Sequence, residues 1–501
     1  MANWRAQGGA TMLGSHPTRG DKPSMNPSSL NPASPRRRVR ALAFGIACAL
    51  GLPLAAQAQT SSSSGNVSAR ERQLEQRVDQ LEQELAQLKG MIQAQKAAQA
   101  QPAPAAAPAA PAQSVAAAPA SAKPVFTSAP GVSVALHGFI SASAFSQNKS
   151  FTYGNGQNAL FPVPGSQGSL SGVDVRNTRF WLDFSGAKFA GDWVGGGRIE
   201  MDFFGGFNGT GAYSRQQITP RLRQAYMDLT NPLTGTTIRI GQQWDLMFPL
   251  NSPTSLAHIA FPLGFASGYG GWRFPGIVWM QDLNHGSSGP AWRLDLGAFD
   301  GSWSGPGNNV NYLSGGNAGF RPQVEARLSV KGKDWLVYGA GHYSRVDLRG
   351  VGGAEPAPIK SDLKSTGYEL GASWKPGPWD FKGVAYTGRA LGQIFGAMSQ
   401  FGDIQEDGGF VQAGYHFTPN WSMYAFYAYA SPDDDDVIRW LGNGSTGLLK
   451  NRQAALSLQY AAGAYELGVE LLHDKLDSTS DGIDRKTTTG NQVSLNALYH
   501  F

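Results

Sequence analysis

The chain of 501 residues is 41% hydrophobic and 15% charged, and its one cysteine, Cys48, excludes a fold held together by disulfides. Its formal charge of +5 arises in residues 1–58, where seven Lys/Arg outnumber one acid by six and leave −1 for the rest, so the charge gives no argument for a nucleic-acid partner. The only apolar run of helical length lies in the same N-terminal region, which excludes a bundle of transmembrane helices.

The N-terminal region has the pattern of a secretory signal peptide. Four arginines within residues 36–40 precede the apolar run 41–54, and Ala56 and Ala58 supply the small residues of a cleavage site. A run of this length is too short to span the roughly 30 Å hydrocarbon core of a bilayer, which argues against a transmembrane anchor. We therefore predict that residues 1–58 are a leader, removed after Ala58, and that the mature chain is exported.

Two segments without a core of their own follow the leader. In residues 67–96 apolar side chains recur at alternating intervals of four and three, as in a short coiled coil: Leu74, Val78, Leu81, Leu85, Leu88 and Ile92. About three heptads are marginal for a helix that associates alone, so we expect it to depend on an already oligomeric barrel; a single amphipathic helix on a surface is the alternative. Residues 97–130 are mostly Ala, Pro, Gln and Ser, which predicts a flexible, semi-extended linker.

Residues 131–501 consist of short alternating segments separated by long and short connections in turn. We predict sixteen strands: 132–146, 175–186, 192–205, 219–230, 235–246, 273–282, 290–301, 320–330, 334–346, 365–375, 378–390, 408–417, 420–431, 450–461, 464–474 and 490–501. An even number of strands of about ten residues, with long external loops and short periplasmic turns, is typical of an outer-membrane barrel. The predicted fold is therefore all-β, a 16-stranded antiparallel transmembrane β-barrel.

Charged residues in the middle of these strands indicate a wet interior. Successive side chains point to opposite faces, and a charge facing lipid at mid-strand costs a few kcal/mol, so the charged face should line a pore. The predicted pore-lining residues are Arg179, Arg198, Glu200, Asp202, Arg239, Gln243, Asp245, Arg293, Asp295, Glu325, Arg327 and Lys382, with Glu369, Glu466 and Glu470 as further acids. In segment 219–230 the pattern conflicts, because Arg221 and Arg223 share a face with Met227 and Leu229.

The third long connection, residues 246–272, is too apolar for a loop that extends into water. In strand count and loop order the chain resembles general porins, and this resemblance implies a third loop that folds into the barrel and narrows it beside Arg239, Gln243 and Asp245. Packing across a subunit interface, or over the rim, is the alternative. The predicted constriction residues are Met247, Phe248, Phe261 and Phe265.

The C-terminal segment repeats the barrel pattern. Val493, Leu495, Ala497, Tyr499 and Phe501 fall on one face of a strand, and polar residues fall on the other. The terminal phenylalanine, with an aromatic residue two positions before it, resembles the closing strand of bacterial outer-membrane barrels. We therefore expect the chain to lie in the outer membrane of a Gram-negative bacterium, with its N-terminal segment in the periplasm.

The order of leader, coiled coil, linker and barrel resembles the DcaP-like trimeric outer-membrane porins, and residues 221–226 (RLRQAY) and 241–245 (GQQWD) look like stretches of that family. The resemblance implies a homotrimer for passive diffusion of small hydrophilic solutes, often anions such as dicarboxylates. From residue 131 onward 28 basic residues face 30 acids, so total charge alone does not support anion preference. The placement of charges must decide it.

Two other functions remain open from the sequence. The coiled coil and linker suit a structural tether that grips peptidoglycan, with the barrel as its anchor in outer-membrane lipid. An outer-membrane enzyme would need a nucleophile and a base, and no such pattern, metal spacing or cofactor motif is visible. For Asp433–Asp436 in a predicted external loop, a solvated acidic loop is favoured over a divalent-cation site.

Overall fold

The computed structural model describes residues 125–129, 131–152, 154–207, 216–268, 270–300, 322–347, 359–360, 362–392, 398 and 401–501. The predicted leader, the predicted coiled coil 67–96 and the linker up to residue 124 lie outside these residues. In the described part of the chain, no helix is long and apolar enough to cross a bilayer.

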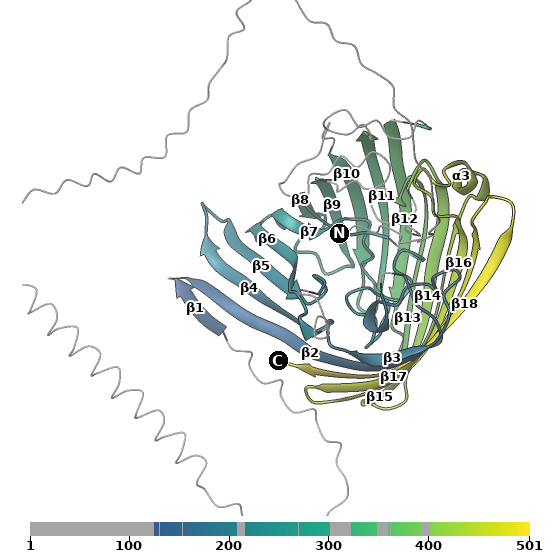
Figure 1. Ribbon diagram of the computed structural model, residues 1–501. Helices are drawn as coiled ribbons and strands as arrows, with labels where there is room; N and C mark the ends of the chain where they lie inside the picture. The colour runs from purple at the N-terminus through teal and green to yellow at the C-terminus, as the bar shows by residue number, and fades with distance from the viewer. Residues whose placement is uncertain are drawn as a thin grey trace, which may run out of the picture. The chain divides into compact units, whose positions relative to one another are not determined.

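The described residues form one closed antiparallel sheet, in which consecutive strands pair, except β3 with β4, and β18 pairs back with β2 (Figure 1). Strands β3 and β4 pair with successive parts of β2 and together make one interrupted strand, which confirms the sixteen-stranded barrel. The strands are β2 (Val132–Gln147), β3 (Leu170–Asp174), β4 (Arg179–Lys188), β5 (Val194–Asp202), β6 (Arg221–Asn231), β7 (Thr236–Trp244), β8 (Arg273–Asp282), β9 (Ala291–Phe299), β10 (Gln323–Lys331), β11 (Trp335–Asp347), β12 (Asp362–Trp374), β13 (Trp379–Arg389), β14 (Gln405–His416), β15 (Trp421–Pro432), β16 (Leu448–Ala462), β17 (Tyr465–Thr479) and β18 (Arg485–His500).

The strand predicted at 175–186 begins only at Arg179 in the structure, as β4. Residues 175–178 separate it from β3, which lies in residues predicted to belong to the preceding connection. The Asn177 side chain donates a hydrogen bond to the Ala257 carbonyl (2.5 Å) and accepts one from the Ala260 amide (3.1 Å). The break therefore frees this stretch to bind the third long connection. At the other end of the chain, β18 begins at Arg485, five residues before the predicted start at residue 490. Its pairing with β17 continues through the polar stretch Lys486–Thr489, where no apolar alternation indicates a strand.

A β-bulge resolves the conflicting pattern of β6. Met201 of β5 lies opposite Leu222, but Glu200 lies opposite Gln224, so Arg223 is the extra residue. One extra residue reverses the alternation of side chains. Arg223 and Gln224 are consequently both buried, whereas Leu222 and Met227 are exposed.

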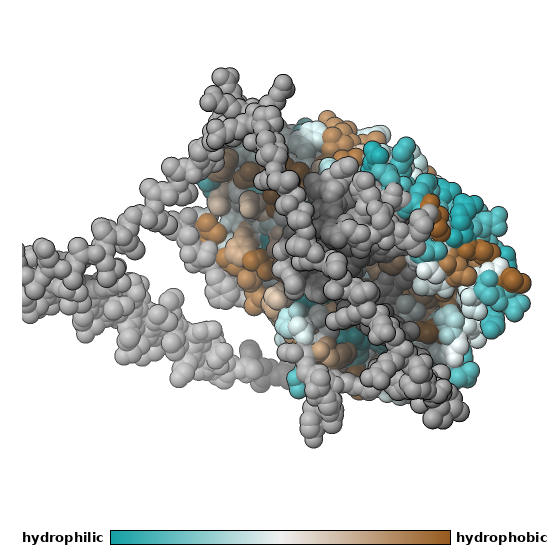
Figure 2. Space-filling view, turned by 45° about the horizontal axis from the view of Figure 1, so that its top comes forward, coloured by the Kyte–Doolittle hydropathy of each residue, from teal (hydrophilic) through white to brown (hydrophobic). Residues whose placement is uncertain are grey.

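The outer surface of the barrel is apolar and has two sectors. Exposed Ile, Leu, Val and Met side chains lie on both, but every strongly exposed Trp or Tyr among the described residues lies on β9–β18: Trp292, Trp335, Tyr343, Tyr368, Trp374, Trp379, Trp421, Tyr427, Tyr429, Tyr465 and Tyr499. Figure 2 shows hydrophilic residues gathered at the upper right of the view, beside hydrophobic patches. Aromatic girdles of this kind mark the membrane interfaces of barrels, so β9–β18 carry the clearer lipid-facing pattern.

Strand β1 (Val125–Ala129) lies within the segment predicted as linker and pairs with residues 132–135 of β2. Further along the same edge of β2, toward its C-terminal end, residues 139–147 pair with β18. The backbone of Phe501 exchanges two hydrogen bonds with Gly138 (3.0 and 3.1 Å). Strands β1 and β18 therefore lie end to end along β2.

The acidic run at Asp433–Asp436 begins the short helix α3 (Asp434–Arg439). Asp433 caps it by accepting a hydrogen bond from the Asp436 amide (2.9 Å), and the buried Asp436 carboxylate pairs with Arg389 (3.0 Å) and Arg439 (3.1 Å). Acids suit a helix N-terminus because of its partial positive charge. No group of His, Cys, Asp and Glu that could hold a metal ion occurs among the described residues.

Candidate functional site

The third long connection, from Asp245 to Trp272, joins β7 to β8, and we name it the third loop. Hydrogen bonds of Asp245 join its two ends. The Asp245 carboxylate accepts hydrogen bonds from the amides of Phe248 and Trp272 (both 2.7 Å), and its own amide donates to the Trp272 carbonyl (2.9 Å). Burial, and then the nearby negative charge of Glu325, raises the pKa of Asp245 well above the usual range, against the opposing effect of these two amides. The two ends of the loop are thereby tied together.

The same loop packs along the lumen side of β10–β14. Glu325 of β10 accepts a hydrogen bond from the Leu246 amide (2.6 Å). Further along, Asn251 donates to the carbonyls of Ala372 (2.6 Å) and Gly383 (3.0 Å), and Lys382 donates to the Thr254 hydroxyl (2.7 Å). Side chains and backbone from three strands therefore fix the first half of the loop.

His258 fixes the second half of the loop to β17. Its Nδ1 lies 2.7 Å from the Glu470 carboxylate and its Nε2 lies 3.1 Å from the Ala159 carbonyl. The Ser255 hydroxyl also donates to Glu470 (2.6 Å). A carbonyl only accepts hydrogen bonds, so Nε2 of His258 carries a proton. This buried contact joins β17, the third loop and the first long connection, residues 148–169 between β2 and β3.

An apolar core accompanies these polar contacts. Loop residues of the first and third connections pack with inward-facing residues of β13–β17; the cluster includes Leu160, Phe161, Phe261, Leu263, Phe265, Phe410, Phe426, Leu448 and Leu472. Met247 belongs to a second cluster with Leu246, Phe274 and Phe299. The predicted constriction residues Met247, Phe261 and Phe265 are thus buried in packing.

Apart from Lys188 and Asp282 at the ends of β4 and β8, the charged residues of the opposite wall, β4–β8, are six arginines and four carboxylates: Arg179, Arg198, Arg221, Arg223, Arg239 and Arg273 with Asp183, Glu200, Asp202 and Asp228. We name this set the basic wall. Arg198 forms a two-pronged pair with Asp183 (2.7 and 2.9 Å), and Arg239 forms one with Asp228 (both 2.8 Å). Six cations against four anions leave a surplus of two positive charges.

Arg179 and Arg273 carry that surplus. Nε and Nη2 of Arg179 and Nη1 of Arg273 are buried without a hydrogen-bond partner. The closest carboxylate to Arg179, Glu200, is 3.9 Å away, and Glu200 is already engaged by Arg223. The Arg273 guanidinium lies 4.7 Å from the Trp244 ring and 4.3 Å from the Trp272 ring. These two guanidinium groups therefore supply the net positive charge of the wall, with their unpartnered donor atoms buried in it.

A cavity of about 740 Å³ separates the basic wall from the tip of the third loop. Arg179, Arg198, Arg223 and Arg239 line one side of it, and loop residues 252–256 line the other. Tyr226, Trp244 and Phe248 add aromatic surface, and Tyr424, Gln459 and Glu466 complete the wall. The arginines thus face water-accessible space.

The structure divides the predicted pore-lining residues into two groups. Arg179, Arg198, Glu200 and Arg239 line this cavity, as does Phe248. The other predicted residues contact the wall or the third loop instead. Asp202 pairs with Arg221 and Arg223, and Asp295 pairs with Arg293 and Arg327. Gln243 donates a hydrogen bond to the Gly276 carbonyl, and Arg327 donates one to the Leu246 carbonyl. Asp245, Glu325 and Lys382 form hydrogen bonds that hold the third loop.

Sequence reasoning missed Arg223, Arg273, Tyr226 and His258 as site residues. The Arg223 orientation depends on a bulge, and the sequence signal was only a pattern conflict. Arg273 begins β8 and His258 lies inside a loop, so neither has an alternation that would place it. Their positions follow from tertiary contacts.

No protein-family model matches the sequence, and no curated protein matches it either. Among solved structures, the outer membrane channel DcaP of Acinetobacter baumannii is similar, with a TM-score of 0.57 and 21% identity over 75% of this chain and 99% of that chain. OmpF of Salmonella typhi, in complex with daunomycin, has a TM-score of 0.50 and 15% identity over 75% of this chain and 100% of that chain. At these identities the likeness shows the fold, and it confirms the fold implied by the sequence resemblance to DcaP-like porins.

Proposed function

We propose that this protein is an outer-membrane porin for passive diffusion of small hydrophilic solutes, with a preference for anions such as dicarboxylates. One observation carries the proposal: the third loop packs over the acidic side of the lumen and leaves the basic wall facing the open cavity. The balanced composition of the barrel hides this asymmetry.

The acids under the loop are removed from the solute path. Glu325, Glu369 and Glu470 are 5%, 2% and 1% exposed, and each accepts a hydrogen bond. In contrast, the side chains of Arg198 and Arg239 are 30% and 27% exposed and line the cavity. Their partner acids Asp183 and Asp228 are 33% and 20% exposed, so the net positive charge of the basic wall belongs to Arg179 and Arg273. Coulomb interactions strengthen in a confined passage of reduced dielectric, so this net charge should attract anions.

The third loop also supports a constriction. It contacts the wall from β10 to β17, and its residues 252–256 lie across the cavity from the arginines. A solute crossing the barrel here would pass between a fixed loop and a basic wall. Selectivity in narrow pores depends on the charges that line them.

A homotrimer is part of the proposal. In the sector β2–β8 the strongly exposed outer side chains include Ile140, Phe180, Ile199, Leu222, Met227, Ile240 and Ile277, and none is Trp or Tyr among the described residues. A wall without an interfacial aromatic girdle suits contact with another subunit better than contact with lipid. We infer that this sector forms the subunit interface.

The tether to peptidoglycan is the second candidate. Strand β1 attaches the end of the predicted linker to the barrel wall by backbone pairing with β2, and a load-bearing connection would need such an attachment. A barrel that conducts no ions in planar bilayers would favour this function over diffusion.

The decisive experiment is the reversal potential of the full-length protein in a planar bilayer under a KCl gradient. We expect ohmic conductance and a reversal potential of the sign given by chloride preference, decreasing as salt screens the arginines. A conducting barrel that prefers potassium at low salt would contradict the anion preference but not the pore.

A further inference from the structure

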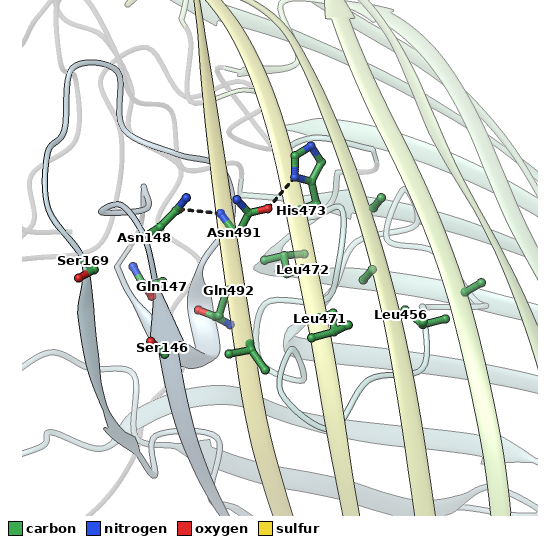
Figure 3. Close-up of a pocket in the computed structure, with 14 residues that line it drawn as sticks. Ser146, Gln147, Asn148, Ser169, Leu456, Leu471, Leu472, His473, Asn491 and Gln492 are labelled. Carbon is green, nitrogen blue, oxygen red and sulfur yellow. Dashed lines mark hydrogen bonds between the residues drawn. The ribbon is translucent and has the colours of Figure 1, made fainter.

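A groove of about 720 Å³ lies on the wall where β15–β18 meet β2 (Figure 3). Leu456, Leu471 and Val493 are 43%, 50% and 41% exposed on its floor. The small side chains of Ala425 and Ala454, on the neighbouring strands, make the depression. These residues alternate with buried ones such as Ser457, Glu470 and Gln492, so the groove opens outward, away from the pore.

A polar row closes the groove toward the end of the barrel with the long connections. Nδ1 of His473 lies 2.7 Å from the Asn491 side-chain oxygen, and the Asn491 amide donates to the Asn148 side chain (2.8 Å). Figure 3 shows both contacts beyond Leu471 along the strands. The apolar outer surface therefore ends at His473.

Cations occupy the next two rows. Arg452 lies opposite Lys475, and Lys450 lies opposite Asp477. They alternate with the buried Asn451, Gln453, Asp474 and Leu476, so they face outward as the groove does. Asp477 is the one acid here, and it pairs with Arg452 (3.0 Å) and accepts from Thr487 (2.7 Å). Three cations against one acid leave two positive charges above the groove.

We propose that this groove binds a lipid with a phosphate headgroup, with an acyl chain on Leu456, Leu471 and Val493 and the phosphate on Arg452 and Lys475. Lys475 lies four positions after Leu471 on β17, or roughly 13 Å at about 3.3 Å per residue. This spacing matches an amphiphile whose headgroup leaves the apolar layer where its chains begin. Charged side chains at the membrane surface attract anionic lipids electrostatically.

The test is native mass spectrometry of the full-length protein in detergent with two defined lipids, phosphatidic acid and phosphatidylcholine of the same chains. We expect wild-type protein to retain phosphatidic acid preferentially. The double variant Arg452→Gln/Lys475→Gln should lose about tenfold in phosphatidic acid retention and little in phosphatidylcholine retention. Leu471→Ala should weaken retention of both lipids, because it removes acyl contact.

The chain offers a matched control at the same end of the barrel. Arg345 and Lys364 lie opposite each other on β11 and β12 and are exposed, but they do not border the groove. Arg345→Gln/Lys364→Gln removes the same charge and should leave lipid retention unchanged. Unchanged single-channel conductance of the Arg452→Gln/Lys475→Gln variant would show that its barrel is folded.

Three results would overturn the proposal. The first is wild-type preference for phosphatidic acid in Arg452→Gln/Lys475→Gln, and the second is an equal loss in the Arg345→Gln/Lys364→Gln control, which would indicate diffuse attraction. The third is a change of oligomer size in Leu471→Ala with no change in lipid retention, which would assign the groove to a second copy of the chain.

Discussion

The two sides of the barrel lumen hold their charged side chains in different environments. On β4–β8, Arg179, Arg198, Arg223 and Arg239 line a cavity. Buried donor atoms of Arg179 and Arg273 have no hydrogen-bond partner. On β10–β17, Glu325 and Glu470 are buried and accept hydrogen bonds from the third loop, whereas Glu466 lines the cavity. The difference shows that a loop can set the field of a pore by covering one sign of charge, without any change in composition.

The largest expected effect comes from removing the third loop, which buries acids of β10–β17. Replacing residues 247–271 by a short Gly/Ser turn should raise single-channel conductance several-fold, because it opens the cavity, and should move the reversal potential toward cations, because it uncovers Glu325, Glu369 and Glu470. Planar-bilayer recording measures both, with heat-modifiable migration on gels as the test of folding. Higher conductance with unchanged selectivity would show that the buried acids do not matter.

Loosening the base of the loop should have a smaller effect. Asp245→Ala removes the acceptor for the Phe248 and Trp272 amides, and a hydrogen bond typically contributes about 0.5–1.5 kcal/mol to stability. We expect noisier open-channel current and a lower unfolding temperature. Asp282→Ala, at the other end of β8, should change neither. Quiet, wild-type current in Asp245→Ala would mean that the wall contacts alone hold the loop.

Neutralising one arginine tests the exposed side. Arg239→Ala should shift the reversal potential toward cations at low salt, and the shift should shrink at high salt as screening shortens the reach of the charge. Arg293→Ala is the matched control, because Arg293 is also exposed and paired with an acid but does not line the cavity. Equal shifts in the two variants would show that the basic wall has no special role.

The contact between the C-terminal residue and β2 gives a prediction in which the amount of folded protein changes but the conductance does not. The Phe501 ring packs against Gly138, and the two backbones are hydrogen-bonded. Phe501→Ala should therefore lower the amount of folded protein in the outer membrane, and the conductance of what folds should not change. Normal abundance with altered conductance would contradict this prediction.

The smallest expected effect concerns the N-terminal region. Deleting residues 59–124 should leave the detergent-resistant oligomer intact, because we assign the subunit interface to β2–β8. Size-exclusion chromatography with light scattering measures the result. A monomer would show that the predicted coiled coil organises the trimer and that the aliphatic sector faces lipid.

The barrel was predictable because its constraint is local. Alternation places side chains on two faces, and a segment such as 273–282 matches β8 at both ends. The site was less predictable. The β-bulge in β6 places Arg223 on the lumen side. In the sequence it was visible only as a conflict in the alternation of polar and apolar residues. The contact between His258 and Glu470 joins residues 212 positions apart, which no local pattern encodes.

Strand β1 has a consequence for how the barrel closes. It occupies residues 132–135 of the β2 edge, and β18 takes the same edge from residue 139 upward. Phe501 bonds to Gly138, so two residues of this edge, 136 and 137, lie between them. A slip of β18 by four residues toward β1 would keep every side chain on its proper face, so alternation alone does not forbid it. The β1–β2 hairpin blocks that path, and thus acts as a stop that limits where the last strand of the chain can pair.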